Sequence, residues 1–344
     1  MDILRLVARN VVKLLLLLLA VSFVVFFLVS VSPVDPLQAN YGAVTLLNMD
    51  PAKRAELSEF WGKDRPLAER YLTWLTGLVH GDLGMSLRFN QPVATVIAAK
   101  FANSALLLAV AWLISGVAGF ALGVLAGSRR GKPVDKVIMA VCYLFAATPL
   151  FWFAMLLLMV FSVGLGLFPT GFSAPLGKGA DEVTLGETLH HMILPAITLS
   201  IVGVANITLH TREKLLDVLE SDFVRYAAAR GESRRQILKR HALRNIALPA
   251  LTLQFASLAE IFGGSILVEQ VFSFPGLGQA TVMAGLGSDT ALLAGIAVIT
   301  AGIVFVGNTI ANILYGLIDP RIRARSLAAS ATGEAAPTPE GADV

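Results

Sequence analysis

A series of long apolar runs limits what this chain can fold into. The runs cover residues 14–31, 104–127, 137–168, 192–209, 246–268 and 291–318. An α-helix needs roughly 20 apolar residues to cross a bilayer. Because 56% of the residues are hydrophobic and the runs are spread over the whole length, the sequence predicts an all-α polytopic membrane protein with six transmembrane helices.

The distribution of Lys and Arg predicts how these helices are oriented. With residues 1–13 on the cytoplasmic side, the inner connections and both ends hold 19 of the 27 basic residues, and the outer connections hold 8. Cytoplasmic loops of membrane proteins carry such an excess. We therefore expect both termini to be cytoplasmic, with residues 14–31 as an uncleaved first span. The tail 326–344 is rich in Ala, Pro and Gly and is predicted to be disordered.

The segment 32–103 is the longest connection and is predicted to lie outside the membrane. Asp50-Pro51 is a helix-start pattern, and it predicts a helix that ends near Trp61. A second helix is expected after Pro66. In the third apolar run, Pro149 predicts a kink because proline breaks the helical hydrogen-bond ladder.

A polar stretch between the fourth and fifth runs predicts two helices that meet at a corner. Ser221 or Asp222 can cap the first helix, and Gly231 stands where a helix ends in a left-handed residue. Ser233 and Gln236 form a capping-box pattern for the second helix. The chain is expected to turn between Gly231 and Ser233.

The first of these helices has a small-residue surface that suits docking into another protein. Ala227 and Ala228 permit close approach, and Arg225 and Arg230 flank them with guanidinium groups that pair with carboxylates. The alternative from composition alone is an ordinary basic loop beside the membrane.

Three polar residues inside the apolar runs are candidates for the translocation path. Glu260 lies within the fifth run, where an ionisable group normally faces a cavity or a partner, and a structural hydrogen bond to a neighbouring helix is the alternative. Asn308 and Asn312 lie one turn apart in the sixth run and are placed to bond across helices.

The outer end of the fifth run carries a second polar element. Pro275 and the glycines beside it predict a bent re-entrant or surface turn, which is tolerated only where protein or water satisfies the backbone. A plain connecting loop is the alternative. The residues of this candidate outer gate are Glu269, Phe272, Pro275, Gly276 and Gly278.

The sequence does not predict an enzyme. The segment from Gly127 to Pro133 is one residue short of an ATP-binding P-loop and has Pro where Ser or Thr should hold magnesium. Cys142 stands alone, and no residues have the spacing of a catalytic or metal site. Basic residues are not interleaved with aromatics, so we expect no nucleic-acid partner.

Two of these stretches resemble a known family. The residue order of 222–231 and 240–245, which includes His241 and Asn245, is similar to the cytoplasmic EAA loop of ABC importer permeases of the dipeptide, oligopeptide and nickel family. The segment from Glu269 to Gly278 resembles that family's outer element. The general EAA glutamate is absent, since Arg225 stands six residues before Gly231, and Asn312 replaces a usual acidic residue.

The resemblance implies a type I ABC importer permease (MetI-like) fold in a bacterial inner or plasma membrane. It implies a permease core over 104–325 with a coupling loop at 210–249, in which Arg225, Ala227, Ala228, Arg230, Gly231, His241 and Asn245 dock an ATPase. The implied partners are a second homologous permease, two ABC ATPase subunits that hold ATP and magnesium, and an extracytoplasmic substrate-binding protein.

The cargo implied by the resemblance is peptide, with nickel or a metal chelate as the alternative. A stand-alone secondary transporter is the alternative from another class, and it would normally show inverted-repeat symmetry.

Overall fold

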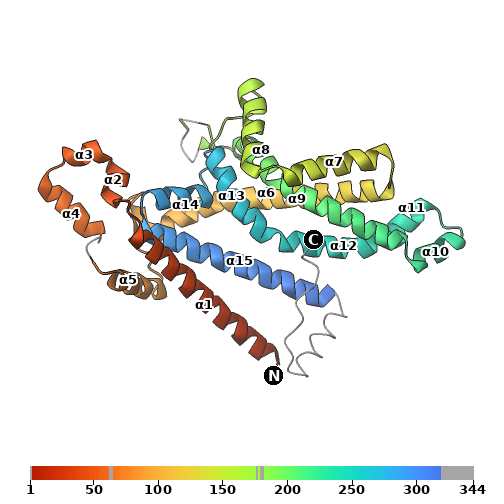
Figure 1. Cartoon of the computed structure of the whole chain (residues 1–344), viewed down its shortest axis with the longest axis horizontal. Coiled ribbons are helices and arrows are strands. Elements are labelled where there is room, and N and C mark those ends of the chain that lie inside the picture. The colour runs from red at the N-terminus through yellow and green to blue at the C-terminus, as the bar shows by residue number, and fades with distance from the viewer. Residues whose placement is uncertain (1, 62–64, 176, 179–181, 319–344) are drawn as a thin grey trace.

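The computed structural model describes residues 2–61, 65–175, 177–178 and 182–318, and these residues are almost entirely helical (Figure 1). The predicted disordered tail at 326–344 lies outside the described residues. The all-α prediction is confirmed except for one short hairpin.

The N-terminal part consists of one long helix and a group of short elements. α1 (Asp2–Val31) is followed by α2 (Pro36–Tyr41), α3 (Ala43–Leu47), α4 (Pro51–Trp61), α5 (Leu67–Val79), β1 (Met85–Ser86) and β2 (Gln91–Pro92). α4 begins where Asp50-Pro51 predicted it, and an Asp50 carboxylate oxygen accepts from the Ala52 N–H at 2.9 Å. The strands were not predicted because each is two residues long.

The remaining helices form the membrane part and its connections. They are α6 (Val93–Ser128), α7 (Pro133–Ala147), α8 (Leu150–Leu157), the π-helical turn η1 (Leu158–Gly164), α9 (Leu185–Leu219), α10 (Asp222–Ala229), α11 (Arg234–Ile237), the π-helical turn η3 (Leu238–Ala242), α12 (Leu243–Ala256), α13 (Leu258–Val271), α14 (Leu277–Leu286) and α15 (Thr290–Ile318).

Within the described residues, four single helices are long and apolar enough to cross a membrane, and two bent pairs bring the number to six. The single spans are Ala8–Val31, Val93–Ser128, Leu185–Leu219 and Thr290–Thr309. Their order matches the first, second, fourth and sixth predicted runs. The bent pairs match the third and fifth.

The third and fifth predicted helices are broken more sharply than expected. α7 and the α8–η1 segment meet at 109°, so the single kinked helix predicted for 137–168 is wrong. Pro149 disfavours helical backbone at Thr148, which has φ −94° and ψ 129°, and α7 ends there. The fifth span is bent by 53° between the segments Arg234–Ala256 and Glu260–Val271.

α6 and α9 form the centre of the bundle and touch along a track of small residues. A Cβ built on Gly123 would lie 2.6 Å from the Thr211 Cβ, so only glycine fits there. The other close pairs are Ser115 with Gly203, Gly119 with Ile207 and Gly127 with Leu215. Small residues allow this approach of helix backbones in membranes. Because the residue numbers rise together along both helices, α6 and α9 run parallel.

Contacts at the outer end join the N-terminal elements to the bundle. α1 packs along α15, and α5 lies against α1, where the Ser22 and Tyr71 hydroxyls are 3.0 Å apart. Asp289 precedes α15 and is buried; it accepts from the Ser86 hydroxyl at 2.6 Å and from the Arg88 N–H at 3.0 Å. This carboxylate fixes the hairpin to the start of α15, and it has no signature in the sequence.

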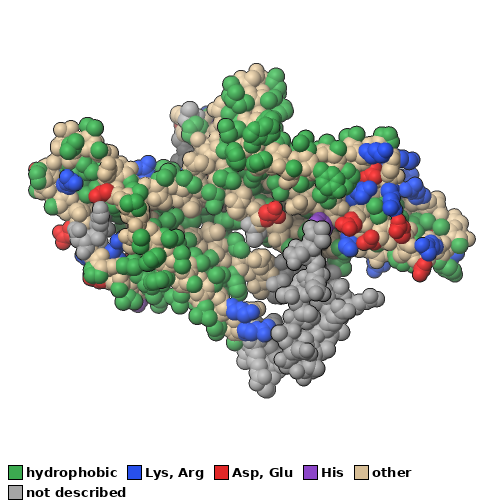
Figure 2. Space-filling model, viewed as in Figure 1, with side chains coloured by type: hydrophobic (Ala, Val, Ile, Leu, Met, Phe, Trp, Pro, Cys, Tyr) green, Lys and Arg blue, Asp and Glu red, His purple; other side chains and the backbone are tan. Residues whose placement is uncertain are grey.

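The charged side chains of the visible face gather at one end of the molecule. Figure 2 shows Lys, Arg, Asp and Glu crowded where α10 and α11 lie, while hydrophobic side chains cover much of the surface between the two ends. α2, α3 and α4 lie at the opposite end (Figure 1). The polar stretch singled out in the sequence therefore forms one pole of the molecule.

Candidate functional site

The charged pole is built around the predicted corner. Gly231 has φ +86°, the left-handed conformation that its position at a helix end predicted. The Ser233 N–H donates to the Gln236 side-chain oxygen at 2.8 Å, and the Ser233 hydroxyl accepts from the Gln236 N–H at 3.4 Å. The capping box is confirmed, although α11 continues through η3 into α12 and is not a separate short helix.

α10 turns one face inward and one outward. Val224 and Ala227 are buried against Ile237, Val218 and Leu219. Ala227 has only 4% of its surface exposed, so it supports the helix from within and does not lie on the predicted docking surface. Helical periodicity could have separated the buried positions 224 and 227 from their exposed neighbours.

The outward surface of α10, here called the α10 outer face, consists of Phe223, Arg225, Tyr226, Ala228 and Arg230. Two of its members are large hydrophobic residues that sequence reasoning missed, with Phe223 at 47% and Tyr226 at 67% exposure. The Arg230 guanidinium lies 6.0 Å from the Tyr226 ring centre. Exposed aromatic and arginine side chains together are typical of protein interfaces.

A buried ion pair supports the corner from the membrane side. The Arg212 Nε donates to Asp135 Oδ1 at 2.6 Å and its Nη2 donates to Oδ2 at 2.9 Å, while the Gly131 N–H donates to Oδ2 at 2.8 Å. The Asp135 side chain is 4% exposed and that of Arg212 is 22% exposed. This bidentate pair fixes the first turn of α7 to α9.

The turn between α6 and α7 also makes polar contacts with the elements before and after the corner. Arg234 donates to the Ser128 carbonyl at 2.7 Å, and Arg130 pairs with Glu220 at the end of α9. The corner is therefore attached to α6 and α9 by polar contacts. None of these partners was predicted, because they are at least 90 positions apart in sequence.

His241 and Asn245 follow the corner, on η3 and α12, and Asn245 is exposed. The His241 Nε2 is 3.0 Å from a Glu232 carboxylate oxygen, and the Asn245 side chain donates to the His241 carbonyl at 2.8 Å. His241 is half-buried. Both predicted docking residues thus make contacts within their own chain that stabilise the turn.

The predicted outer gate converges on a buried carboxylate. Glu269 is fully buried and accepts from the Ser104 hydroxyl at 2.6 Å and the Gln279 N–H at 3.1 Å. Gly276 and Gly278 pack so closely on Glu269 that a Cβ on either would collide with neighbouring atoms. These contacts satisfy the backbone of the bend, as a re-entrant turn requires.

The other two members of the predicted gate are also held in place. Phe272 is 1% exposed, and its carbonyl accepts from the Phe172 N–H at 3.0 Å. The Pro275 carbonyl accepts from the Asn103 side chain at 3.0 Å. The element from Glu269 to Gly278 therefore links α13, α14 and the start of α6, and it is not a free connecting loop.

Among the described residues, the translocation-path candidates do not contact one another through their side chains. Glu260 is exposed at the start of α13, beside the bend in the fifth span, and Asn308 is exposed on α15. Among the described residues, neither has a hydrogen bond or an ion pair with its side chain. The Asn312 side chain lies outside the described part of the structure.

A polar link that the sequence did not reveal lies next to the same bend. The Trp112 indole donates to the Gln254 carbonyl at 2.8 Å, and the Gln254 amide donates back to the Trp112 carbonyl at 2.5 Å. This reciprocal pair joins α6 to the last turn of α12. This pair of hydrogen bonds cannot be predicted from composition, because Trp112 and Gln254 belong to different apolar runs.

Comparison with known proteins places the chain in a transport family. Residues 119–324 match the model of the family described as binding-protein-dependent transport system inner membrane component, and residues 3–109 match the model of its N-terminal part.

Three relatives match nearly their whole length. The oligopeptide transport system permease protein AppB of Bacillus subtilis is 37% identical over 89% of this chain and 95% of its own. The protein OppB of Mycobacterium tuberculosis, named for the same function, is 33% identical over 93% and 99%. The dipeptide transport system permease protein DppB of Escherichia coli is 31% identical over 89% and 94%.

A solved structure of the MetNI methionine ABC transporter in inward-facing conformations also matches. It is 16% identical over 64% of this chain and 97% of that chain, with a TM-score of 0.48. The two family models together cover most of the described helices, including the corner and the outer element. The chain therefore belongs to the binding-protein-dependent transport system inner membrane components, the permease family that its two polar elements resemble.

Proposed function

We propose that this chain is the membrane-spanning permease subunit of an ATP-driven importer of peptides. The names of its relatives, which specify oligopeptide or dipeptide transport, favour peptides over nickel. The alignments with these relatives cover 89–93% of this chain and 94–99% of the relatives' own lengths. We propose that N- and C-termini are both cytoplasmic, in keeping with the distribution of basic residues.

The observation that carries the proposal is the α10 outer face at the charged pole. Phe223 and Tyr226 are exposed beside Arg225 and Arg230, on a helix whose inner face is packed. An aromatic and basic ridge of this kind suits a groove in an ATPase subunit. ATP and magnesium would be bound by two such subunits, with none bound by this chain.

The family description supports two further partners. Binding-protein-dependent transport implies a substrate-binding protein that delivers cargo at the outer face. A second, homologous permease subunit would pair with this chain to form the pathway. The outer gate around Glu269 is the part of this chain that would face the delivered peptide.

Alternating access requires that ATP favours one state of the membrane helices over the other. Closure of the ATPase subunits would move α10, and the contacts of the turn 129–132 would carry that movement to α6, α7 and α9. Glu260 is exposed at the start of α13 and is proposed to attract a peptide amino terminus.

ATP hydrolysis by the complex, purified through this chain and reconstituted in liposomes, tests the proposal. With the binding protein present, di- and tripeptides should stimulate hydrolysis, and nickel or nickel chelates should not. Stimulation by nickel alone would overturn the peptide assignment. Transport by this chain without ATPase subunits would instead support a secondary transporter.

A pair of variants tests the docking face separately. Tyr226→Ala should reduce the amount of ATPase subunit that co-purifies by about tenfold, because exposed aromatic anchors at interfaces contribute about 1–2 kcal/mol or more. Lys239→Ala is the control, since Lys239 is exposed outside the α10 outer face. Equal recovery of ATPase with both variants would contradict this role for α10.

A further inference from the structure

A cavity of about 830 Å³ lies at the outer end of α1, away from the corner and the outer gate. Its walls come from α1, α4, α5, the β1 strand and the start of α15. The first apolar span ends at Val31, and the cavity walls include Phe26 and Val29 before that point and Ser32 after it. The cavity therefore straddles the depth at which a bilayer changes from hydrocarbon to headgroups.

One wall of the cavity presents hydrogen-bond donors that lack anionic partners. Arg70 is half-buried, and among the described residues its side chain donates only to the Thr290 hydroxyl, at 3.3 Å. Burial lowers the pKa of its guanidinium, because desolvation disfavours the charged form. The Trp74 side chain follows one turn later on the same face of α5, and its buried indole N–H has no acceptor among the described residues.

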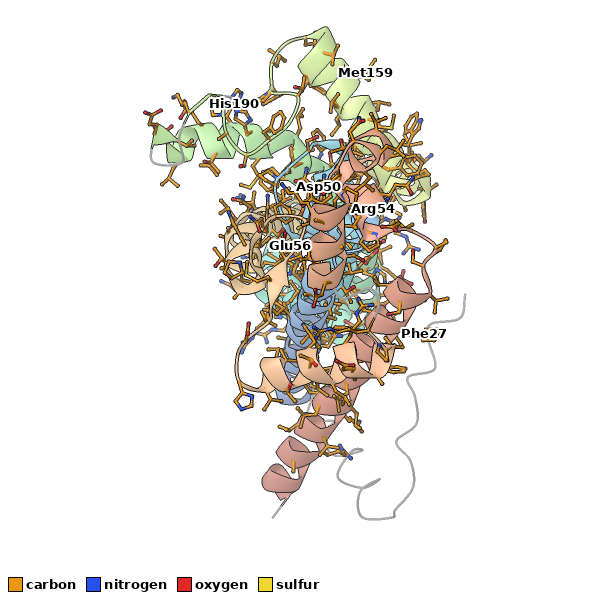
Figure 3. The ribbon with its side chains drawn as sticks, turned by 90° about the vertical axis from the view of Figure 1, so that its left-hand side faces the viewer. Phe27, Asp50, Arg54, Glu56, Met159 and His190 are labelled. Carbon is orange, nitrogen blue, oxygen red and sulfur yellow. The ribbon has the colours of Figure 1, made fainter. Side chains whose placement is uncertain are left out.

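The opposite wall presents carboxylates. Glu56 and Glu59 line the cavity from α4, and no ion pair within the described part of the chain involves either. Figure 3 labels Glu56 and its neighbour Arg54 on α4, and Phe27 on α1. Arg54 does not line the cavity. The charged residues that line the cavity are thus two arginines, Arg65 and Arg70, and three carboxylates, Glu56, Glu59 and Asp82.

The surroundings indicate the class of ligand. Phe27 and Leu28 are 46% and 61% exposed on α1, so a continuous apolar surface runs from the cavity down the first span. A ligand that matches these features carries an oxoanion, an ammonium group and long apolar chains. We propose that this cavity binds the headgroup of a zwitterionic phospholipid, with Arg70 holding the phosphate and Glu56 and Glu59 holding the ammonium group.

The physical basis is the pairing of a partly desolvated guanidinium, that of Arg70, with a phosphate, and of the exposed Glu56 and Glu59 carboxylates with an ammonium group. A phosphate oxygen can accept from the guanidinium of Arg70, and a charge-assisted bond of this kind is about twice as strong as a neutral one. An ammonium headgroup can donate to carboxylates, whereas a glycerol headgroup lacks the positive charge. The site should therefore prefer phosphatidylethanolamine to phosphatidylglycerol.

Native mass spectrometry of the complex purified through this chain tests the proposal. With either lipid added in detergent, the wild type should retain phosphatidylethanolamine more tightly than phosphatidylglycerol. Arg70→Gln should weaken retention of phosphatidylethanolamine by at least about tenfold, the effect of losing a hydrogen bond to a charged group. Arg54→Gln removes a matched arginine outside the cavity and should change nothing.

Two further variants separate binding from a folding defect. Glu56→Gln with Glu59→Gln should abolish the preference between the two lipids while retention of phosphatidylglycerol stays at the wild-type level. Trp74→Phe keeps an aromatic side chain but removes the pyrrole ring with its N–H, and it should weaken phosphatidylethanolamine retention by about threefold.

Wild-type retention in Arg70→Gln, or an unchanged lipid preference in the double variant, would overturn the proposal. Displacement of the lipid by a dipeptide in the wild type would also overturn it, by assigning the cavity to the cargo.

Discussion

Breaking the Asp135–Arg212 pair should destabilise the part of the bundle next to the corner more than breaking an exposed ion pair does. Removal of one partner from a fully buried pair costs about 3–5 kcal/mol, because the other charge is left without compensation. The Arg212 side chain retains 22% exposure and can reach some water. We therefore expect about 2–3 kcal/mol for Asp135→Ala and a similar loss for Arg212→Met.

A double-mutant cycle separates this pairing from other effects of the substitutions. Asp135→Ala with Arg212→Met should cost at least about 1 kcal/mol less than the sum of the single changes, because neither charge is then left unpaired. Denaturant unfolding of the detergent-solubilised chain, followed by tryptophan fluorescence, gives the free energies. Additive single effects would refute the reasoning.

The control lies on the same helix. Lys214 and Asp217 form an exposed pair at 3.3 Å on α9, with side chains 56% and 62% exposed. Exposed pairs of this kind contribute less than about 1 kcal/mol. Lys214→Met should therefore leave unfolding almost unchanged. A loss equal to that of Arg212→Met would show that the substitution itself, and not the buried pair, is responsible.

Three further substitutions have distinct expected outcomes. Gly231→Pro should leave ATP hydrolysis running while peptide uptake stops, because proline cannot adopt φ +86°; liposome assays of both rates check this. Gly123→Val should abolish recovery of folded protein, measured by size-exclusion chromatography, since even a Cβ there would lie 2.6 Å from the Thr211 Cβ. Glu269→Ala should lower unfolding stability by about 1–3 kcal/mol, because it leaves the Ser104 hydroxyl and a backbone N–H without their acceptor.

A specific experimental result would contradict each of these predictions. Normal uptake by Gly231→Pro would argue against a left-handed corner that transmits movement. Gly263→Val is the control for Gly123→Val, since Gly263 is an exposed helical glycine whose Cβ would meet no atom within 4 Å, and equal losses in both would remove the steric argument. Unchanged unfolding of Glu269→Ala would mean that water replaces the carboxylate.

The corner was predicted well because its rules are local. Gly231, Ser233 and Gln236 lie within six positions, and capping preferences act over that distance. The six apolar runs were predicted for the same reason, since hydrophobicity along one segment decides whether it can enter a bilayer.

Contacts between distant segments could not be predicted from the sequence. Asp135 and Arg212 are 77 positions apart, and nothing near either residue specifies the other. Helical periodicity can indicate that Val224 and Ala227 share a buried face, but it cannot identify Ile237 as the residue against which they pack. Likewise, Pro149 predicted a bend but could not predict 109°, because the angle depends on the helices against which α8 packs.

The track of glycines between α6 and α9 has a mechanical consequence. Helices whose backbones touch through small residues cannot slide or separate without losing close packing, so α6 and α9 should move as one rigid lever. α9 has 35 residues and is about 50 Å long. A tilt of about 5° at the corner would then shift the outer end by roughly 4 Å. Spin labels on α6 and α9 should keep a constant separation throughout the ATP cycle. The angles of the bends in the third and fifth spans should change instead.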